Sequence, residues 1–164
     1  MTYEAFAAAG SGLGAAGFWV LDDTADMAAV AEAVAWFLHV ESCGQCSPCK
    51  IGTGSISQVL HRVRTGMSLG SDAGALARAL ATVSDGARCH LPTQARDVVS
   101  SILASFPDDF ARPDSRSPVL VEVPKLVDLA DGVAIVDERQ ARKRPDWTYG
   151  DVPVRIGEPR PIPT

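Results

Sequence analysis

The chain has 164 residues, of which 46% are hydrophobic and 21% are charged, and its formal net charge is -5. This composition is typical of a globular domain with a core of its own, and it excludes a fully disordered or fibrous chain. The acidic balance leaves no basic surplus, and basic and aromatic residues do not interleave, so we expect no nucleic-acid partner.

The longest strongly apolar stretch, residues 28–40, has only 13 residues and contains Glu32 and His39. A membrane span needs ~20 apolar residues, so no direct membrane insertion is predicted. No lysine or arginine precedes Lys50, so the start of the chain lacks the charge pattern of a secretory signal or a transit peptide. We expect a cytoplasmic protein, one that could sit peripherally on the inner face of a membrane complex.

Near the N-terminus, residues 2–10 are predicted to be helical, and GFWVL at residues 17–21 is apolar and aromatic enough for a strand. Between them, Gly12, Gly14 and Gly17 match the G-x-G-x-x-G pattern of dinucleotide-binding sites. That motif requires a strand before the glycines and a helix after them, whereas the order here is reversed and the acidic residues that follow come too soon. We interpret these glycines as turn formers.

Four stretches then show apolar residues at helical spacings of three and four. They run from Met27 to Leu38, Ile56 to Val63, Leu76 to Val83 and Val98 to Phe106. Boundary signals agree with this interpretation. They are Thr24 as the N-cap of the first helix, Ser47-Pro48 and Ser71-Asp72 at the start of the second and third, and Gly66 and Gly86 at their ends. The predicted fold is mainly α, a short antiparallel four-helix bundle.

The last third of the chain has a different composition. Nine of the 11 prolines fall at or after Pro107. This distribution predicts extended, turn-rich chain rather than helix over residues 107–164. Two short strands are possible there, at Val119 to Val123 and Val133 to Val136.

All four cysteines belong to one pattern, Cys43-x-x-Cys46-x-x-Cys49 followed after 39 intervening residues by Cys89. Three closely spaced thiolates with one distant partner suit the corners of a [4Fe-4S] cluster. A structural zinc site tends to use two separated pairs, and disulfides are rare in a reducing cytoplasm. The pattern favours the cluster, with structural zinc as the alternative.

Bundle geometry gives an independent argument for this site. In an up-down-up-down bundle, the loop that carries the first three cysteines and the loop that carries Cys89 lie at the same end, so the four should meet. Lys50 and Arg88 would place positive charge beside the thiolates, and His90 could be a nearby donor or an alternative ligand. Three further arginines could serve the same anionic site or occupy a solvated helix face: Arg62, Arg64 and Arg78.

No nucleophile–base pair, carboxylate dyad or phosphate loop is apparent, so no catalytic residue is assigned. His39 and His61 lie near predicted helix faces. We expect both at the surface or partly buried rather than as ligands.

The stretch ESCGQCSPC from Glu41 to Cys49, together with Gly52 and Cys89, resembles the iron-sulfur-binding C-terminal domain of the NADH-binding flavoprotein subunit of respiratory complex I. NAD-linked hydrogenases and formate dehydrogenases share that domain. The resemblance extends upstream through GSGLGAAGFWVLDD, which is similar to the end of an SLBB domain, and downstream to SILASFPDDF. It divides the chain into an SLBB-like remnant (1–25), a helical iron-sulfur-binding domain (26–110) and an extended tail (111–164).

By this resemblance, Cys43, Cys46, Cys49 and Cys89 hold one [4Fe-4S] cluster. The cluster receives electrons from FMN that NADH has reduced and passes them toward other clusters. The FMN and NAD(H) sites of that family lie in a large N-terminal domain, so we expect them on a partner chain or a missing domain. The chain alone is therefore not expected to be catalytic, and it would be a truncated fragment or a split subunit.

Partners implied by the resemblance are the flavin- and NADH-binding chain or domain and other iron-sulfur subunits. Lys50 stands where the family usually has arginine, Pro92 stands where glycine is common, and the tail is long, so a divergent member is expected. The first functional hypothesis is an electron-transfer module of an NAD(P)H-linked oxidoreductase. The alternative is a non-redox interaction module that a zinc ion or a silent cluster staples together.

Overall fold

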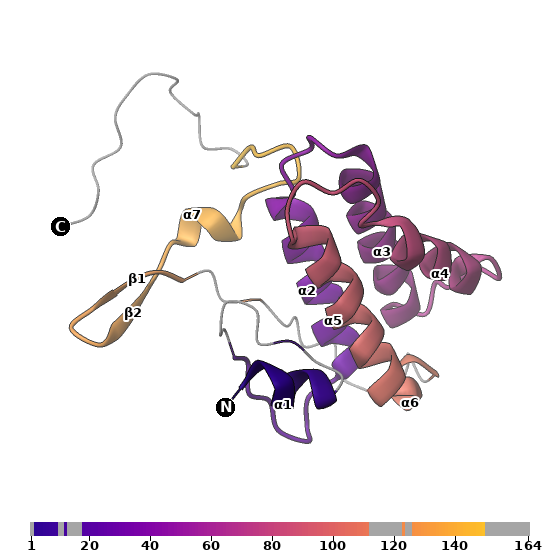
Figure 1. Ribbon diagram of the computed structural model, residues 1–164, viewed down its shortest axis with the longest axis horizontal. Coiled ribbons are helices and arrows are strands. Elements are labelled where there is room, and N and C mark those ends of the chain that lie inside the picture. Colours follow the sequence, from indigo (N-terminus) through magenta and orange to yellow (C-terminus); the bar gives the residue numbers. More distant parts are fainter. Residues whose placement is uncertain (1, 10–11, 13–17, 112–122, 124–125, 150–164) are drawn as a thin grey trace. The chain divides into compact units, whose positions relative to one another are not determined.

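The computed structural model describes residues 2–9, 12, 18–111, 123 and 126–149. The chain divides into two compact units, Met1–Val123 and Pro124–Thr164, and each is described by itself. The fold is mainly helical, which confirms the predicted class (Figure 1). None of the described helices is long and apolar enough to cross a membrane.

The first unit opens with α1 (Tyr3–Ala8), which confirms the predicted N-terminal helix. The strand predicted at 17–21 is wrong for the residues described there, because 18–21 have no regular structure and are exposed. A strand needs a neighbour to pair with its N–H and C=O groups, and the described part of this unit contains no other strand. Phe18 packs instead against Phe6 of α1, with ring centroids 6.0 Å apart.

Helices α2 to α5 form the body of this unit. They are α2 (Met27–Glu41), α3 (Ser47–Arg64), α4 (Asp72–Thr82) and α5 (Leu91–Ser105). Helix α2 packs against α3 and α5, and α3 packs against α4. The α2–α3 and α4–α5 connections lie at the same end of these helices (Figure 1). This arrangement brings the two cysteine-bearing segments together.

The apolar spacings seen in the sequence correspond to the buried faces of these helices. Ile56, Val59 and Leu60 of α3 are fully buried. They belong to one core with Leu76, which lies in α4, and Val83, which is the C-cap of that helix. Residues of α2 and α5 complete the same core: Val30, Ala31, Ala35, Val99 and Ile102. The phase predicted for α4 is therefore right, although its Leu80 is only partly buried at the edge of the core.

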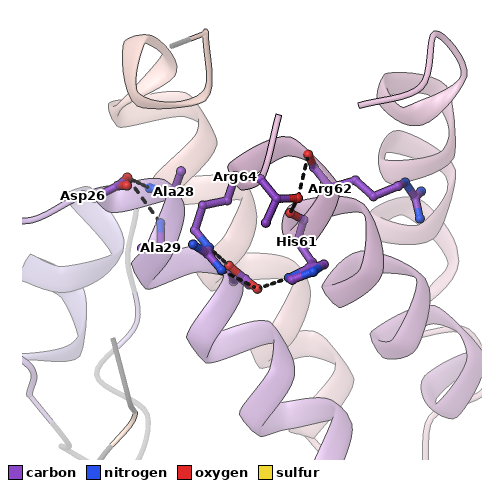
Figure 2. A network of polar contacts seen from close by, with 8 residues as sticks. Asp26, Ala28, Ala29, His61, Arg62 and Arg64 are labelled. Carbon is purple, nitrogen blue, oxygen red and sulfur yellow. Dashed lines mark hydrogen bonds and ion pairs between the residues drawn. The ribbon is translucent and has the colours of Figure 1, made fainter. Parts of the chain in front are cut away.

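Helix α2 begins later than the predicted cap, Thr24. Its N-cap is Asp26, whose carboxylate accepts from the backbone N–H groups of Ala28 and Ala29 at 3.0 and 3.3 Å (Figure 2). Thr24 lies before this cap and donates its hydroxyl to Asp22 at 2.6 Å. Asp26 is the better cap because it directly precedes the first helical residue and reaches both free N–H groups.

The predicted starts of α3 and α4 and the predicted end of α3 hold to within a residue or two, whereas α4 ends at Thr82, before the predicted Gly86. Cys46 rather than Ser47 is the N-cap of α3, and Ser71 is the N-cap of α4 as predicted. Gly66 and Gly86, after α3 and α4, have φ of 71° and 60°. This left-handed region favours glycine, which explains why α3 ends next to Gly66 and why the turn that follows α4 ends at Gly86.

The prediction that residues 107–164 contain no helix is wrong. Helix α6 (Pro107–Ala111) starts at a proline, and the first helical position tolerates proline because its N–H would be unpaired anyway. Helix α7 (Glu138–Ala141) is capped by Asp137, which accepts from the Arg139 N–H at 2.9 Å.

The second unit contains an antiparallel hairpin of β1 (Leu126–Ala130) and β2 (Val133–Val136). The predicted strand at Val133 to Val136 is confirmed. Asp131 and Gly132 form the two-residue turn with φ of 50° and 76°, the backbone that such tight hairpins require. The other predicted strand, at Val119 to Val123, lies outside the described residues apart from Val123, which is not in a strand.

Candidate cysteine site

The four cysteines lie on two segments at one end of the helical core. Cys43 and Cys46 occupy the α2–α3 connection, and Cys49 lies in the first turn of α3. Cys89 stands directly before His90, the N-cap of α5. All four are free thiols, with none in a disulfide.

All four side chains line one cavity of about 140 Å³. The rest of its wall comes from the same two segments and includes Ser42, Gln45, Arg88 and Pro92. A water molecule needs only ~10–15 Å³ of such volume, so the cavity can accept a group of many atoms. The structure therefore brings together cysteines that lie 39 residues apart, as the bundle argument predicts.

The cysteines differ in exposure and influence one another. Cys49 is buried, Cys46 is partly buried, and Cys43 and Cys89 are exposed. Burial raises the pKa of the Cys49 thiol; Cys89, Cys46 and Cys43, in that order, raise this pKa further, and the charge of Lys50 lowers it. Four thiolates here would repel one another, so the deprotonated set requires a cationic group between them.

Among the described residues, no group of three or more histidine, cysteine, aspartate or glutamate side chains is placed to hold one metal ion. In a [4Fe-4S] cluster each protein thiolate binds a different iron, so the four sulfurs surround the cluster at a wider spacing than they would around one ion. The cysteines present fit that group in number, chemistry and shared cavity.

Two helix N-termini border the cavity, and neither has a side-chain cap. No side chain of the N-cap residues Cys46 and His90 accepts from the first turns of α3 and α5. The first N–H groups of a helix carry partial positive charge, which favours an anionic group beside them. Gly44, with φ of 80°, allows the backbone to curl between the first two cysteines.

Arg88 joins the two segments, because its Nη1 donates to Gln45 Oε1 at 3.3 Å across the mouth of the site. His90 is exposed and is not among the residues that line the cavity. The structure therefore gives no support to His90 as an alternative ligand.

A polar network behind Cys49 was not predicted. The Thr53 hydroxyl donates to the Cys49 carbonyl oxygen at 2.8 Å, and His39 Nδ1 lies 3.2 Å from the same hydroxyl. Burial and the charge of Lys50 lower the pKa of His39. Because the single hydroxyl proton of Thr53 is directed at a carbonyl, His39 donates from Nδ1. The spacing of Thr53 four residues after Cys49 is the only sequence signal for this contact.

The arginines at 62 and 64 do not serve the cysteine site. Arg64 and His61 of α3 both bind the carboxylate of Glu32 on α2 (Figure 2), and His61 Nδ1 lies 2.7 Å from it. Arg62 forms a two-pronged pair with Asp72 at 3.0 and 2.6 Å. Arg78 is exposed on α4 and is not among the cavity-lining residues. These charges connect helices or face solvent.

A family model described as the NADH-ubiquinone oxidoreductase-F iron-sulfur binding region matches residues 29–113. The matched segment contains all four cysteines and helices α3 to α5.

Several known proteins are similar over this part of the chain. The F 2 subunit of NADH-quinone oxidoreductase from Rhizobium meliloti (strain 1021) is 42% identical over 66 residues, 40% of this chain and 16% of the relative. The HndC subunit of the NADP-reducing hydrogenase from Solidesulfovibrio fructosivorans is 30% identical over 108 residues, 66% of this chain and 22% of the relative. The F subunit of NADH-quinone oxidoreductase from Rickettsia massiliae (strain Mtu5) is 32% identical over 107 residues, 65% of this chain and 25% of the relative. The chain thus covers a quarter or less of each of these three relatives.

Proposed function

The chain belongs to the family of NADH-ubiquinone oxidoreductase-F iron-sulfur binding regions, and on that basis we propose that it is an electron-transfer module that carries one [4Fe-4S] cluster. In this proposal the module works within an NAD(P)H-linked oxidoreductase and performs no substrate chemistry of its own. Helices α2 to α5 serve as an antiparallel four-helix bundle that holds the site.

One observation carries the proposal: the four cysteines of the chain, separated as three and one in sequence, line one cavity. We assign Cys43, Cys46, Cys49 and Cys89 as the ligands. When bound, the cluster supplies reversible one-electron transfer. The chain would hold it with four thiolates, of which only that of Cys49 is buried, and the uncapped N-termini of α3 and α5 would favour its negative charge.

A single zinc ion is the competing occupant. Four thiolates bound to one zinc each lie ~2.3 Å from it, so their sulfurs must converge on one point. Structural zinc sites tend to use two separated pairs of ligands, whereas these four cysteines are divided as three and one, which favours the cluster. The non-redox module stapled by zinc or a silent cluster therefore remains the second candidate, with less support.

The flavin and the nicotinamide are proposed to bind elsewhere. The relatives that share this region are named as subunits of NADH-quinone oxidoreductases and of an NADP-reducing hydrogenase, and most of their length has no counterpart here. We propose that FMN and NAD(H) bind on a partner chain or another domain. Other iron-sulfur subunits would accept the electrons, and any attachment to a membrane complex would come through these partners.

Metal analysis of anaerobically purified protein tests the proposal. We expect iron and acid-labile sulfide in equal amounts, and an EPR signal that appears on reduction with dithionite. Zinc without sulfide would contradict the cluster. Iron and sulfide without any redox response would contradict the electron-transfer role and favour the silent staple.

A further inference from the structure

Lys50 directly follows the third cysteine, yet its side chain extends back to the end of the preceding helix. Its Nζ donates to the carbonyl oxygens of His39 and Ser42, at 3.1 and 2.9 Å. His39 lies in the last turn of α2, and Ser42 is the C-cap of that helix. The ammonium group therefore binds the C-terminal carbonyls of α2, where the helix carries partial negative charge.

The same contacts close the ligand loop at both ends. Ser42 is almost completely buried, immediately precedes Cys43, and donates its own hydroxyl to the His39 carbonyl at 2.6 Å. Lys50 immediately follows Cys49. The residue before the first cysteine and the residue after the third are thus held together by a direct hydrogen bond.

Lys50 also differs in its surroundings from Arg88, the cation that lines the cavity. It is partly buried and held by backbone oxygens, and its charge acts on the Cys49 thiol. Arg88 is exposed, and its side chain donates to the amide oxygen of Gln45 at 3.3 Å. A charge that is shielded from water and salt acts more strongly on a nearby redox centre than one in solvent.

We propose that Lys50 is the positioning residue of the site: its ammonium fastens the Cys43–Cys49 loop to the end of α2 and raises the reduction potential of the bound cluster. Reduction adds one electron, from a flavin carrier in the protein's own complex or from dithionite in a titration, to an anionic cluster. Lys50 does not itself line the cavity, but its charge acts on the Cys49 thiol, which does. A positive charge near a ligating thiolate stabilises the reduced form of a cluster more than the oxidised form. This inference rests on the proposed cluster.

The experiment compares reconstituted holoprotein variants in EPR-monitored redox titrations. Lys50→Met removes the charge and the hydrogen bonds, Lys50→Arg keeps the charge, and Arg88→Gln is the matched control for an exposed cation. We expect Lys50→Met to shift the one-electron equilibrium toward the oxidised form on the order of tenfold, a fall of about 59 mV in midpoint potential. Lys50→Arg should stay close to wild type. Arg88→Gln should shift less, and its effect should shrink as salt is added.

Equal shifts in Lys50→Met and Arg88→Gln, or a wild-type potential in Lys50→Met with full iron content, would overturn the inference. If Lys50→Met fails to retain iron, hydrogen exchange of the backbone amides of residues 43–49 in the apo-protein tests whether Lys50 fastens the loop. Faster exchange than in wild type and in Arg88→Gln supports the fastening of the loop, and unchanged exchange refutes it. Absence of iron and sulfide from the wild-type protein would instead refute the proposed function, so the two failures are distinguishable.

Discussion

Gly52 of α3 lies directly against Val83 at the end of α4, so that a Cβ at residue 52 would stand 2.9 Å from Val83 Cγ2 and 3.1 Å from its Cα. Val83 is fully buried and cannot turn aside. We predict that Gly52→Ala lowers the free energy of unfolding by about 1–3 kcal/mol through overpacking, although alanine is the better helix former. Denaturant unfolding of the apo-protein measures this change.

The matched control is Gly74→Ala on α4. A Cβ at residue 74 would meet only the flexible end of Arg78, at 3.3 Å. Here the helix propensity of alanine should prevail and stabilise the protein by roughly 0.5–1 kcal/mol. Opposite signs for the two glycine substitutions are expected; a stabilised Gly52→Ala variant would show that α3 and α4 pack less closely than the structure indicates.

A second pair of variants tests the core. Leu60 is 1% exposed and Leu69, in the α3–α4 connection, is 58% exposed. Leu60→Ala should cost about 2–5 kcal/mol because it leaves a cavity in the core. Leu69→Ala, the same chemical change at the surface, should cost less than ~0.5 kcal/mol. Similar losses in thermal or denaturant unfolding would place Leu60 outside the core.

Removal of Cys89 tests the assignment of the ligands. Cys89→Ser should lose the iron, the sulfide and the reduced-state EPR signal, because no spare cysteine exists. His90→Ala should retain all three, since His90 does not line the cavity. A Cys89→Ser variant with full iron and an unchanged signal would refute the assignment of Cys89. The wild-type holoprotein should also melt at a higher temperature than the apo-protein, because binding energy adds to folding energy.

Acid should destabilise the apo-protein through His39. Its pKa is lowered in the folded state, by burial first and by Lys50 second, below the value of ~6.5 expected in the unfolded chain. As pH falls below about 6.5, the unfolded chain takes up a proton that the folded chain resists, so the free energy of unfolding decreases until pH passes the folded-state pKa. Above about pH 6.5 this contribution is constant.

Unfolding curves of wild type and His39→Gln between about pH 7.5 and 5 measure that contribution. The variant should show a shallower loss of stability across the interval, whatever its stability at neutral pH. The same slope in both proteins would assign the loss to other groups.

The sequence was sufficient for the helices of the core because their apolar spacing reflects burial directly. Ile56, Val59 and Leu60 recur at helical intervals and all point into the core. The meeting of Cys89 with the other cysteines could be predicted too, since helix connections in a bundle alternate between its two ends.

Other features could not be derived from periodicity. Residues 18–21 have the composition of a strand, but a strand forms only with a partner that local sequence does not reveal. The hairpin of the second unit had a usable signal, the Asp131-Gly132 pair between apolar runs, and only its second strand was predicted. The contacts of Lys50 with the end of α2 depend on where two helix ends meet in space.

The place of Cys89 directly before α5 also determines when the site can exist during synthesis. The ribosome produces Cys43, Cys46 and Cys49 first, and 39 further residues must emerge before Cys89 does. Helix α5, which follows Cys89, packs against α2, so the Cys89 segment is positioned by contacts between distant parts of the chain. A nascent chain that ends before Cys89 thus presents only three of the four proposed ligands, and one that ends before Leu91 lacks the helix that packs the Cys89 segment against α2.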